Sequence, residues 1–161
     1  MEKLFWEMMK LYAGDPLQIQ HFMKVHSFAR LIGLEEKIDD ATQNILEIAA
    51  IVHDIGIKPA MEKHGSGSGK YQELEGPPVA RAMLENLAYT SDVIDRVCYL
   101  VGRHHTYTNI DGIDYQILIE ADFLVNMFES EMSMNAIQST LHKIFRTQSG
   151  KRYCQLMFNV V

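Results

Sequence analysis

Apolar residues recur along most of the chain at the three- and four-residue spacing of helices that bury one face. Glycines, prolines and polar capping residues separate these periodic segments, as in Asp15-Pro16, which supplies a cap and a first helical residue. The expected helices cover about Glu2 to Tyr12, Pro16 to Gly33, Asp39 to Gly56, Pro78 to Leu87, Ser91 to Arg103, Tyr115 to Phe128 and Met134 to Phe145. No segment alternates with the period of two that a strand requires. The pattern predicts an all-α bundle of about six to seven helices.

Two segments do not fit a packed helix. The stretch from Lys58 to Lys70 contains Pro59 and the run Gly65-Ser66-Gly67-Ser68-Gly69, which is typical of a mobile, exposed loop. The tail from Tyr153 to Val161 is apolar enough to dock on the body. Because 161 residues suit one domain better than two, we expect a single domain over 1–161 with its C-terminal helix and tail docked.

The composition is that of an ordinary soluble globular protein, with 47% apolar and 22% charged residues. A net charge of −6 argues against nucleic acid polymers and anionic membranes as partners, since both would repel the chain. Neither a signal-peptide pattern nor an apolar run of the ~20 residues that span a bilayer is visible. We therefore expect a cytoplasmic protein, in which Cys98 and Cys154 are reduced core residues.

Several ionisable residues fall on apolar helix faces. At ~100° per residue, His21 shares one arc of its helix with Leu17, Val25 and Ile32, whereas His26 points about 140° away. His21 is therefore the histidine expected to face the core.

A histidine and a carboxylate end the most apolar helix. His53 and Asp54 follow the run 46–52, and Asp122 lies within the similarly apolar run 117–125. Burying a carboxylate costs several kcal/mol unless the group is paired or binds a metal. A structural salt bridge would explain one such residue, but three helices that each bring a ligand-type group inward favour a metal site. Glu120, about 200° from Asp122 on the same helix, is expected to be solvated or to support the site indirectly.

The order of His21, the pair His53-Asp54 and then Asp122 resembles the H…HD…D pattern of the HD-domain metal-dependent phosphohydrolases. The resemblance covers about residues 17–130. It implies that these four residues hold a divalent metal, with Mn, Fe, Co, Ni and Mg as the candidates.

Members of this family with two ions carry further ligands between the HD pair and the last aspartate, and Glu75 and His105 are the candidates here. Leu74-Glu75-Gly76 resembles a stretch where diadenosine-tetraphosphate-cleaving members have histidine before glycine, so glutamate is a departure. Arg103-His104-His105-Thr106 resembles their later histidine motif. One ion and two ions both remain open.

The resemblance implies a hydrolase for a phosphorylated small molecule, such as a nucleotide, that uses a metal-activated water. Asp54, Lys58 and His104 are the predicted catalytic residues: Asp54 to bridge ions or accept a proton, Lys58 to contact phosphate, and His104 to contact substrate or support a ligand. A di-iron HD oxygenase and a non-catalytic ligand-binding HD domain are the alternatives. The oligomeric state stays open.

Overall fold

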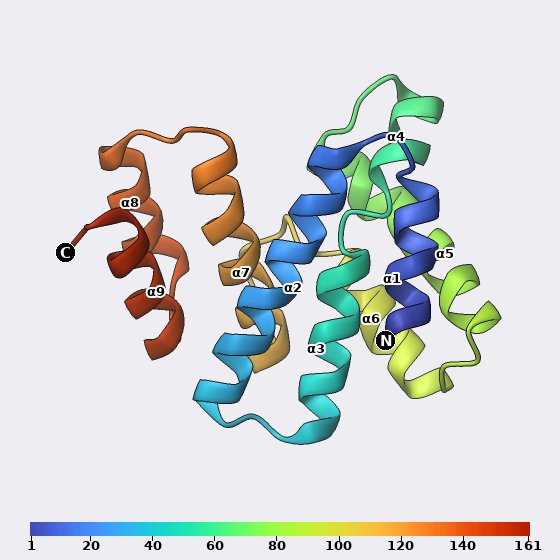
Figure 1. The fold of residues 1–161 in the computed structure, drawn as a ribbon, viewed down its shortest axis with the longest axis horizontal. Helices are drawn as coiled ribbons and strands as arrows, with labels where there is room; N and C mark the ends of the chain where they lie inside the picture. The colour runs from blue at the N-terminus through green and yellow to red at the C-terminus, as the bar shows by residue number, and fades with distance from the viewer.

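The computed structural model describes residues 1–161, which form nine α-helices and no strands (Figure 1). The helices are α1 (Glu2–Leu11), α2 (Pro16–Glu36), α3 (Asp40–Val52), α4 (Ile57–His64), α5 (Gly69–Asn86), α6 (Ser91–Val101), α7 (Ile113–Glu129), α8 (Met134–Ile144) and α9 (Gln148–Phe158). The all-α prediction is confirmed, but the predicted number of six to seven helices is wrong. No helix has both the length and the apolar character needed to cross a membrane.

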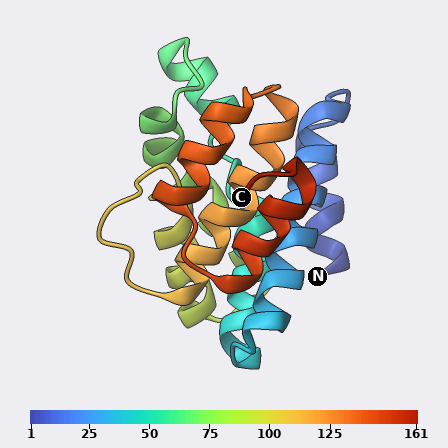
Figure 2. The same cartoon turned by 90° about the vertical axis from the view of Figure 1, so that its left-hand side faces the viewer.

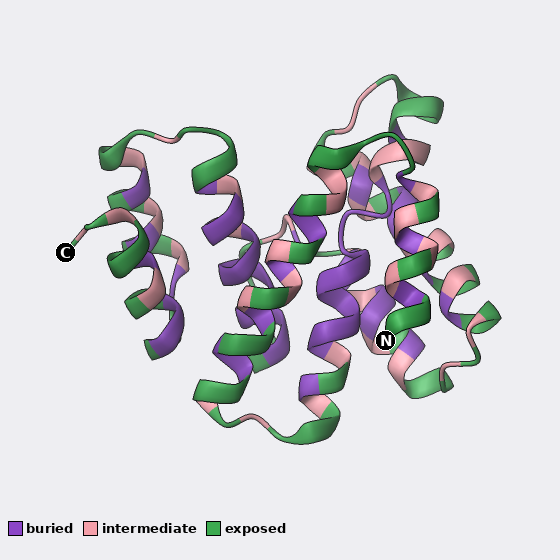
Figure 3. Cartoon of the chain, in the orientation of Figure 1, coloured by how far each residue is buried: buried purple, intermediate pink, exposed green.

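Helix α3 is the central element of the fold. It packs against α1, α2, α6 and α7, so its residues from Leu46 to Val52 are buried on every side (Figure 3). This burial explains why the segment is apolar around its whole circumference rather than on one stripe. His53 and Asp54 follow directly after its last residue and lie buried in the interior beside α2 and α7.

Helix α2 begins as the sequence predicts. Asp15 accepts a hydrogen bond from the Gln18 N–H at 3.1 Å, and Pro16 occupies the first turn. His21 and Val25 are buried as expected. Leu17, predicted to share their inward arc, is 80% exposed and lines two hollows at the surface instead.

The segment predicted as a loop is mostly helical. Helix α4 covers Ile57–His64, with Pro59 in its first turn, where a missing N–H does no harm. Helix α5 starts at Gly69 and continues through Pro77 and Pro78, so only 65–68 remains as a connection. Packing of α5 on α4 and α6 outweighs the helix-breaking tendency of the prolines.

Close backbone contact joins α4 and α5 beside Asp54. A Cβ atom on Gly56 would lie 2.4 Å from the Gln72 carbonyl oxygen and 2.9 Å from the Gly76 nitrogen. Only glycine fits at this crossing. The absence of a side chain on Gly56 lets the first turn of α5 lie close to the end of α3.

The expected C-terminal tail is helix α9, which forms a hairpin with α8 across α7 (Figure 2). Glu120 on α7 attaches this hairpin to the rest of the fold. Its Oε1 accepts hydrogen bonds from the main-chain N–H groups of Arg146 and Thr147 at 2.6 and 2.9 Å. Its Oε2 accepts from the Thr147 hydroxyl. The prediction of a solvated Glu120 is therefore wrong, because the turn between α8 and α9 covers it completely.

Candidate metal centre

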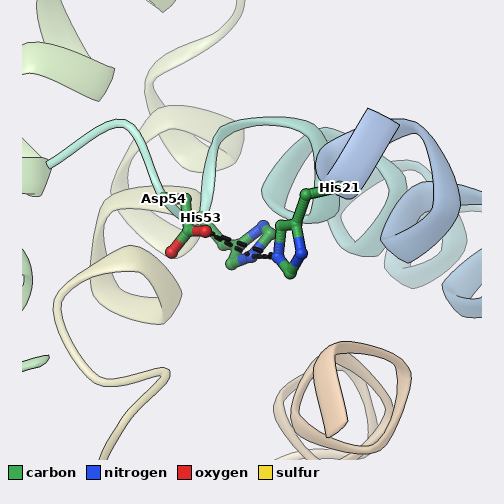
Figure 4. Close-up of side chains that lie close together, drawn as sticks. All are labelled: His21, His53 and Asp54. Carbon is green, nitrogen blue, oxygen red and sulfur yellow. Dashed lines mark hydrogen bonds and ion pairs between the residues drawn. The ribbon is translucent and has the colours of Figure 1, made fainter. Parts of the chain in front are cut away.

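The side chains of His21, His53, Asp54 and Asp122 converge at the centre of the fold. His21 Nε2 lies 3.2 Å from His53 Nε2 and 3.2 Å from Asp122 Oδ1. Asp54 Oδ2 lies 3.4 Å from His21 Nε2 and 3.5 Å from His53 Nε2 (Figure 4). The structure thus brings together the four predicted ligands, from α2, the end of α3 and α7.

The histidines of this cluster are fixed through their outer ring nitrogens. His53 Nδ1 donates to the Ala50 carbonyl at 2.9 Å, and His21 Nδ1 donates to Glu129 Oε2 at 2.8 Å. Both rings therefore present Nε2 to the centre. Ligating histidines in metal sites are oriented in the same way, by hydrogen bonds from the nitrogen that does not bind the metal.

His104 repeats this arrangement on the other side of Asp54. Its Nδ1 donates to the Val101 carbonyl at 2.8 Å, and its Nε2 lies 3.4 Å from Asp54 Oδ1. The Nε2 atom is buried and has no hydrogen-bond partner. A buried, unpaired nitrogen that faces a carboxylate is costly unless a cation or a proton joins them.

The pKa shifts in the cluster favour the binding of a cation. Burial lowers the pKa of His21, but Asp122 and Asp54 outweigh that effect and raise it to about 9. Burial raises the pKa of Asp54, but His53, His104 and His21 outweigh it and hold this pKa far below its ordinary range. Carboxylates that stay ionised among imidazole nitrogens form a set of donor atoms suited to a divalent metal.

The ligand-type atoms form two groups that share Asp54. One contains His21, His53 and Asp54, and the other contains Asp54, His104 and His105, with atoms within 4.8 Å of one another in each. His105 is half-buried, and burial together with His104 lowers its pKa to about 4, so its ring is neutral at physiological pH. The residues present thus fit one ion at the first group and a second at the other.

Glu75 belongs to neither group. Its carboxylate is held by the Lys63 amine and by His64 Nε2, the latter at 2.9 Å. The structure instead turns Gln72, one helical turn earlier, towards the site, where its Oε1 lies 3.2 Å from His105 Nε2.

Lys58 does not reach the site either. Its amine donates to the Leu11 carbonyl and lies 5.0 Å from the centre of the Tyr12 ring. Helix α4 carries Lys58 to the side facing α1, so this structure does not place it for the predicted phosphate contact. Tyr12 in turn donates to the Asp54 main-chain carbonyl at 2.7 Å, which helps to fix the HD pair.

The cluster opens into a cavity of about 420 Å³ lined mainly by acidic, amide and histidine side chains and by no lysine or arginine. Sequence reasoning missed several of the lining residues: Gln18, Gln72, Asn126 and Glu129. Gln18 donates to Asp54 Oδ2 at 2.9 Å, and Asn126 donates to Asp122 Oδ1 at 2.8 Å. Helical spacing was the available signal, since Gln18 lies three residues before His21, and Asn126 lies four after Asp122.

Comparison with known proteins agrees with this geometry. The HD domain family model matches residues 19–139, so the chain belongs to the HD domain family. The crystal structure of a predicted HD superfamily hydrolase from an uncultured Thermotogales bacterium has a TM-score of 0.71 and 21% sequence identity to it. That match covers 99% of this chain and 85% of the other, and it establishes a shared fold. No curated protein is significantly similar to the chain.

Proposed function

We propose that this protein is a metal-dependent phosphohydrolase that cleaves a small phosphoester. The observation that carries the proposal is the set of imidazole Nε2 atoms and ionised carboxylates of His21, His53, Asp54 and Asp122 facing one another at the base of a cavity. Membership of the HD domain family supports it. The buried, unpaired Nε2 of His104 supports a second ion at Asp54, His104 and His105.

A divalent ion at these residues would act as a Lewis acid that lowers the pKa of a water and polarises a phosphoryl oxygen. The cavity itself offers no lysine or arginine to an anionic substrate. The substrate phosphate would therefore depend on the metal centre for its positive charge, and substrate binding should require the metal.

The protein residues have separate tasks in this proposal. Asp54 is held by Gln18 on Oδ2 and faces His104 with Oδ1, so it is placed between the two groups and can accept a proton from water. Gln72 and Asn126 present amide groups at the cavity wall, where they can orient a phosphoryl oxygen. His105, which is neutral, can hold an ion or substrate but cannot donate a proton at physiological pH.

The test is elemental analysis of protein purified without chelator, followed by phosphate-release assays with Mn²⁺, Co²⁺, Ni²⁺, Fe²⁺ and Mg²⁺. The substrate panel should contain nucleoside monophosphates, dinucleoside polyphosphates and simple alkyl and aryl phosphates. We expect bound transition metal and metal-dependent phosphate release. A metal-loaded protein that releases no phosphate but consumes oxygen would overturn the proposal in favour of an oxygenase.

A further inference from the structure

A second hollow, of about 630 Å³, lies beside the metal cavity between the start of α2, the end of α7 and the α8–α9 hairpin. Its walls are mainly apolar and include Leu17, Met127, Phe128, Met132, Met134 and Phe158. We call it the apolar groove.

The apolar groove adjoins the metal cavity. Leu17 and Glu129 line both spaces. Helical geometry produces this division, since Asn126 and Glu129 face the cavity from α7 while Met127 and Phe128 between them face the groove. Likewise on α2, Gln18 and His21 line the cavity, and Gln20 and Lys24 line the groove.

The charge at the boundary between the two spaces is balanced. Glu129 accepts a hydrogen bond from His21 on one oxygen, and its other oxygen lies 2.6 Å from the Lys24 amine. A ligand that passes from the cavity into the groove therefore meets a neutralised carboxylate. The boundary does not repel an anionic ester.

Several groove side chains are exposed to water. Leu17, Phe128 and Met134 are 80%, 67% and 52% exposed. Apolar side chains gathered around one hollow at the edge of a candidate active site are typical of a ligand-binding surface. Three of the groove residues are methionines, whose flexible thioethers adapt to apolar ligands of variable shape.

We propose that the apolar groove binds the aliphatic chain of an alkyl phosphoester whose phosphate lies in the metal cavity. This inference rests on the proposed phosphohydrolase function and names its substrate class. The shared walls at Leu17 and Glu129 favour one amphiphilic molecule over a separate partner, because a chain attached to a phosphate at the cluster could extend past these residues into the groove. Hydrolysis adds one water across the P–O ester bond and yields an aliphatic alcohol and inorganic phosphate.

Binding is tested separately from catalysis. Calorimetric titration of the Mn²⁺-loaded protein with methyl-, butyl- and octylphosphonate, which are not hydrolysed, measures affinity against chain length below micelle-forming concentrations. We expect octylphosphonate to bind at least ~10-fold more tightly than butylphosphonate, since each buried methylene adds to affinity. Phosphate release from the matching alkyl phosphates measures turnover.

In Phe128→Ser, the gain in affinity from butylphosphonate to octylphosphonate should fall to about threefold or less, because the apolar contact area in the groove is smaller. Metal content should stay unchanged. Leu156→Ser is the matched control, since Leu156 is a 74% exposed apolar residue on α9 that does not line the groove. This control variant should keep the full wild-type gain in affinity from butylphosphonate to octylphosphonate. Met134→Gln provides a second groove variant if Phe128→Ser melts below the wild-type protein.

Affinity that does not depend on chain length, in wild-type protein, would overturn the groove assignment whether or not phosphate is released. A chain-length gain without phosphate release would keep the groove and reject the phosphohydrolase function. Sedimentation that shows a dimer dissociated by Phe128→Ser, together with chain-independent affinity, would assign the groove to a second copy of the chain and overturn the proposal.

Discussion

The Nε2 atom of His104 lies 3.4 Å from Oδ1 of Asp54, while Oδ2 of the same carboxylate faces His21 and His53. Asp54 thus has a different histidine environment at each oxygen. This relationship supports a second ion beside the first, because His104 offers a further donor atom on the far oxygen of Asp54.

Replacing His104 tests the second ion. In His104→Gln the bound metal should fall from two equivalents to one, because the nitrogen that faces Asp54 Oδ1 is lost while His21, His53 and Asp122 remain. Elemental analysis after equilibrium dialysis measures the change. His142→Gln, at an exposed histidine on α8, should keep both equivalents. Wild-type protein that binds only one equivalent would rule out the second ion.

Asp54→Asn should lower metal content and reduce phosphate release by at least ~10²-fold, the low end of what a positioned acid–base group contributes. The amide keeps the size of the side chain but removes the charge that both groups share. The fold should survive, because Gln18 and Tyr12 can still bond the residue. Normal turnover with normal metal content in this variant would contradict the mechanism, and an unfolded variant would indicate a structural role for the carboxylate.

Glu129→Gln should weaken metal binding about 10- to 100-fold, the usual cost of losing a partner that orients a ligating histidine. Glu129 accepts the His21 Nδ1 hydrogen bond at 2.8 Å and sets that ring's direction. Competition with a coloured chelator measures the affinity. Glu131→Gln is the control, since it removes a neighbouring negative charge that is not bonded to His21, and it should leave the affinity unchanged.

Glu120 should make folding stability depend on pH. Burial raises its pKa above 4.5, so the folded state holds the proton more tightly than the unfolded chain. The contribution of Glu120 to the free energy of unfolding is therefore fully present below pH 4.5, and it is lost as pH rises through the folded-state pKa.

Glu120→Gln removes this titration, and its amide can still accept from Arg146 and Thr147 and donate to the Thr147 hydroxyl. Urea unfolding should show this variant gaining stability relative to wild type between pH 4.5 and pH 7. Glu120→Ala, which leaves buried N–H groups without acceptors, should lose about 2 to 3 kcal/mol at pH 7. A constant difference between the glutamine variant and wild type across this range would refute the prediction.

Gly56→Ala should destabilise the fold by about 1 to 3 kcal/mol, because its Cβ would meet the α5 backbone and packed backbones cannot move apart freely. Gly67→Ala is the matched control, since the nearest atom to its Cβ would be the Met61 sulfur at an ordinary 3.5 Å. Urea midpoints measure both variants. Equal midpoints would show that the crossing of α4 and α5 is looser than described.

Much of the fold and of the central cluster was predictable from periodicity. A buried carboxylate in an apolar helix is conspicuous in sequence, which is why Asp54 and Asp122 were identified. His21 was identified because it shares a helix face with Val25. Gln18, Gln72 and Asn126 were not identified from the sequence. Glutamine and asparagine on a helix are usually surface residues, and their role becomes visible only when the helix they face is known.

The region between Asp54 and Ser91 was the least predictable. Pro77-Pro78 reads locally as the start of a helix, so the true start of α5 at Gly69 was missed, and with it the inward position of Gln72. The Gly56 contact that sets this arrangement joins residues far apart in sequence. Local pattern carries no information about such a contact.

Phe158 closes the apolar groove from α9, which lies beyond the residues 19–139 that match the HD family, whereas His21, His53, Asp54 and Asp122 all lie inside them. Most of the groove lies inside the same range as the cluster, and only Leu17 and Phe158 lie outside it. A change in α9 can reshape the wall that Phe158 forms without altering His21, His53, Asp54 or Asp122. One wall of the groove can thus vary independently of the side chains that form the central cluster.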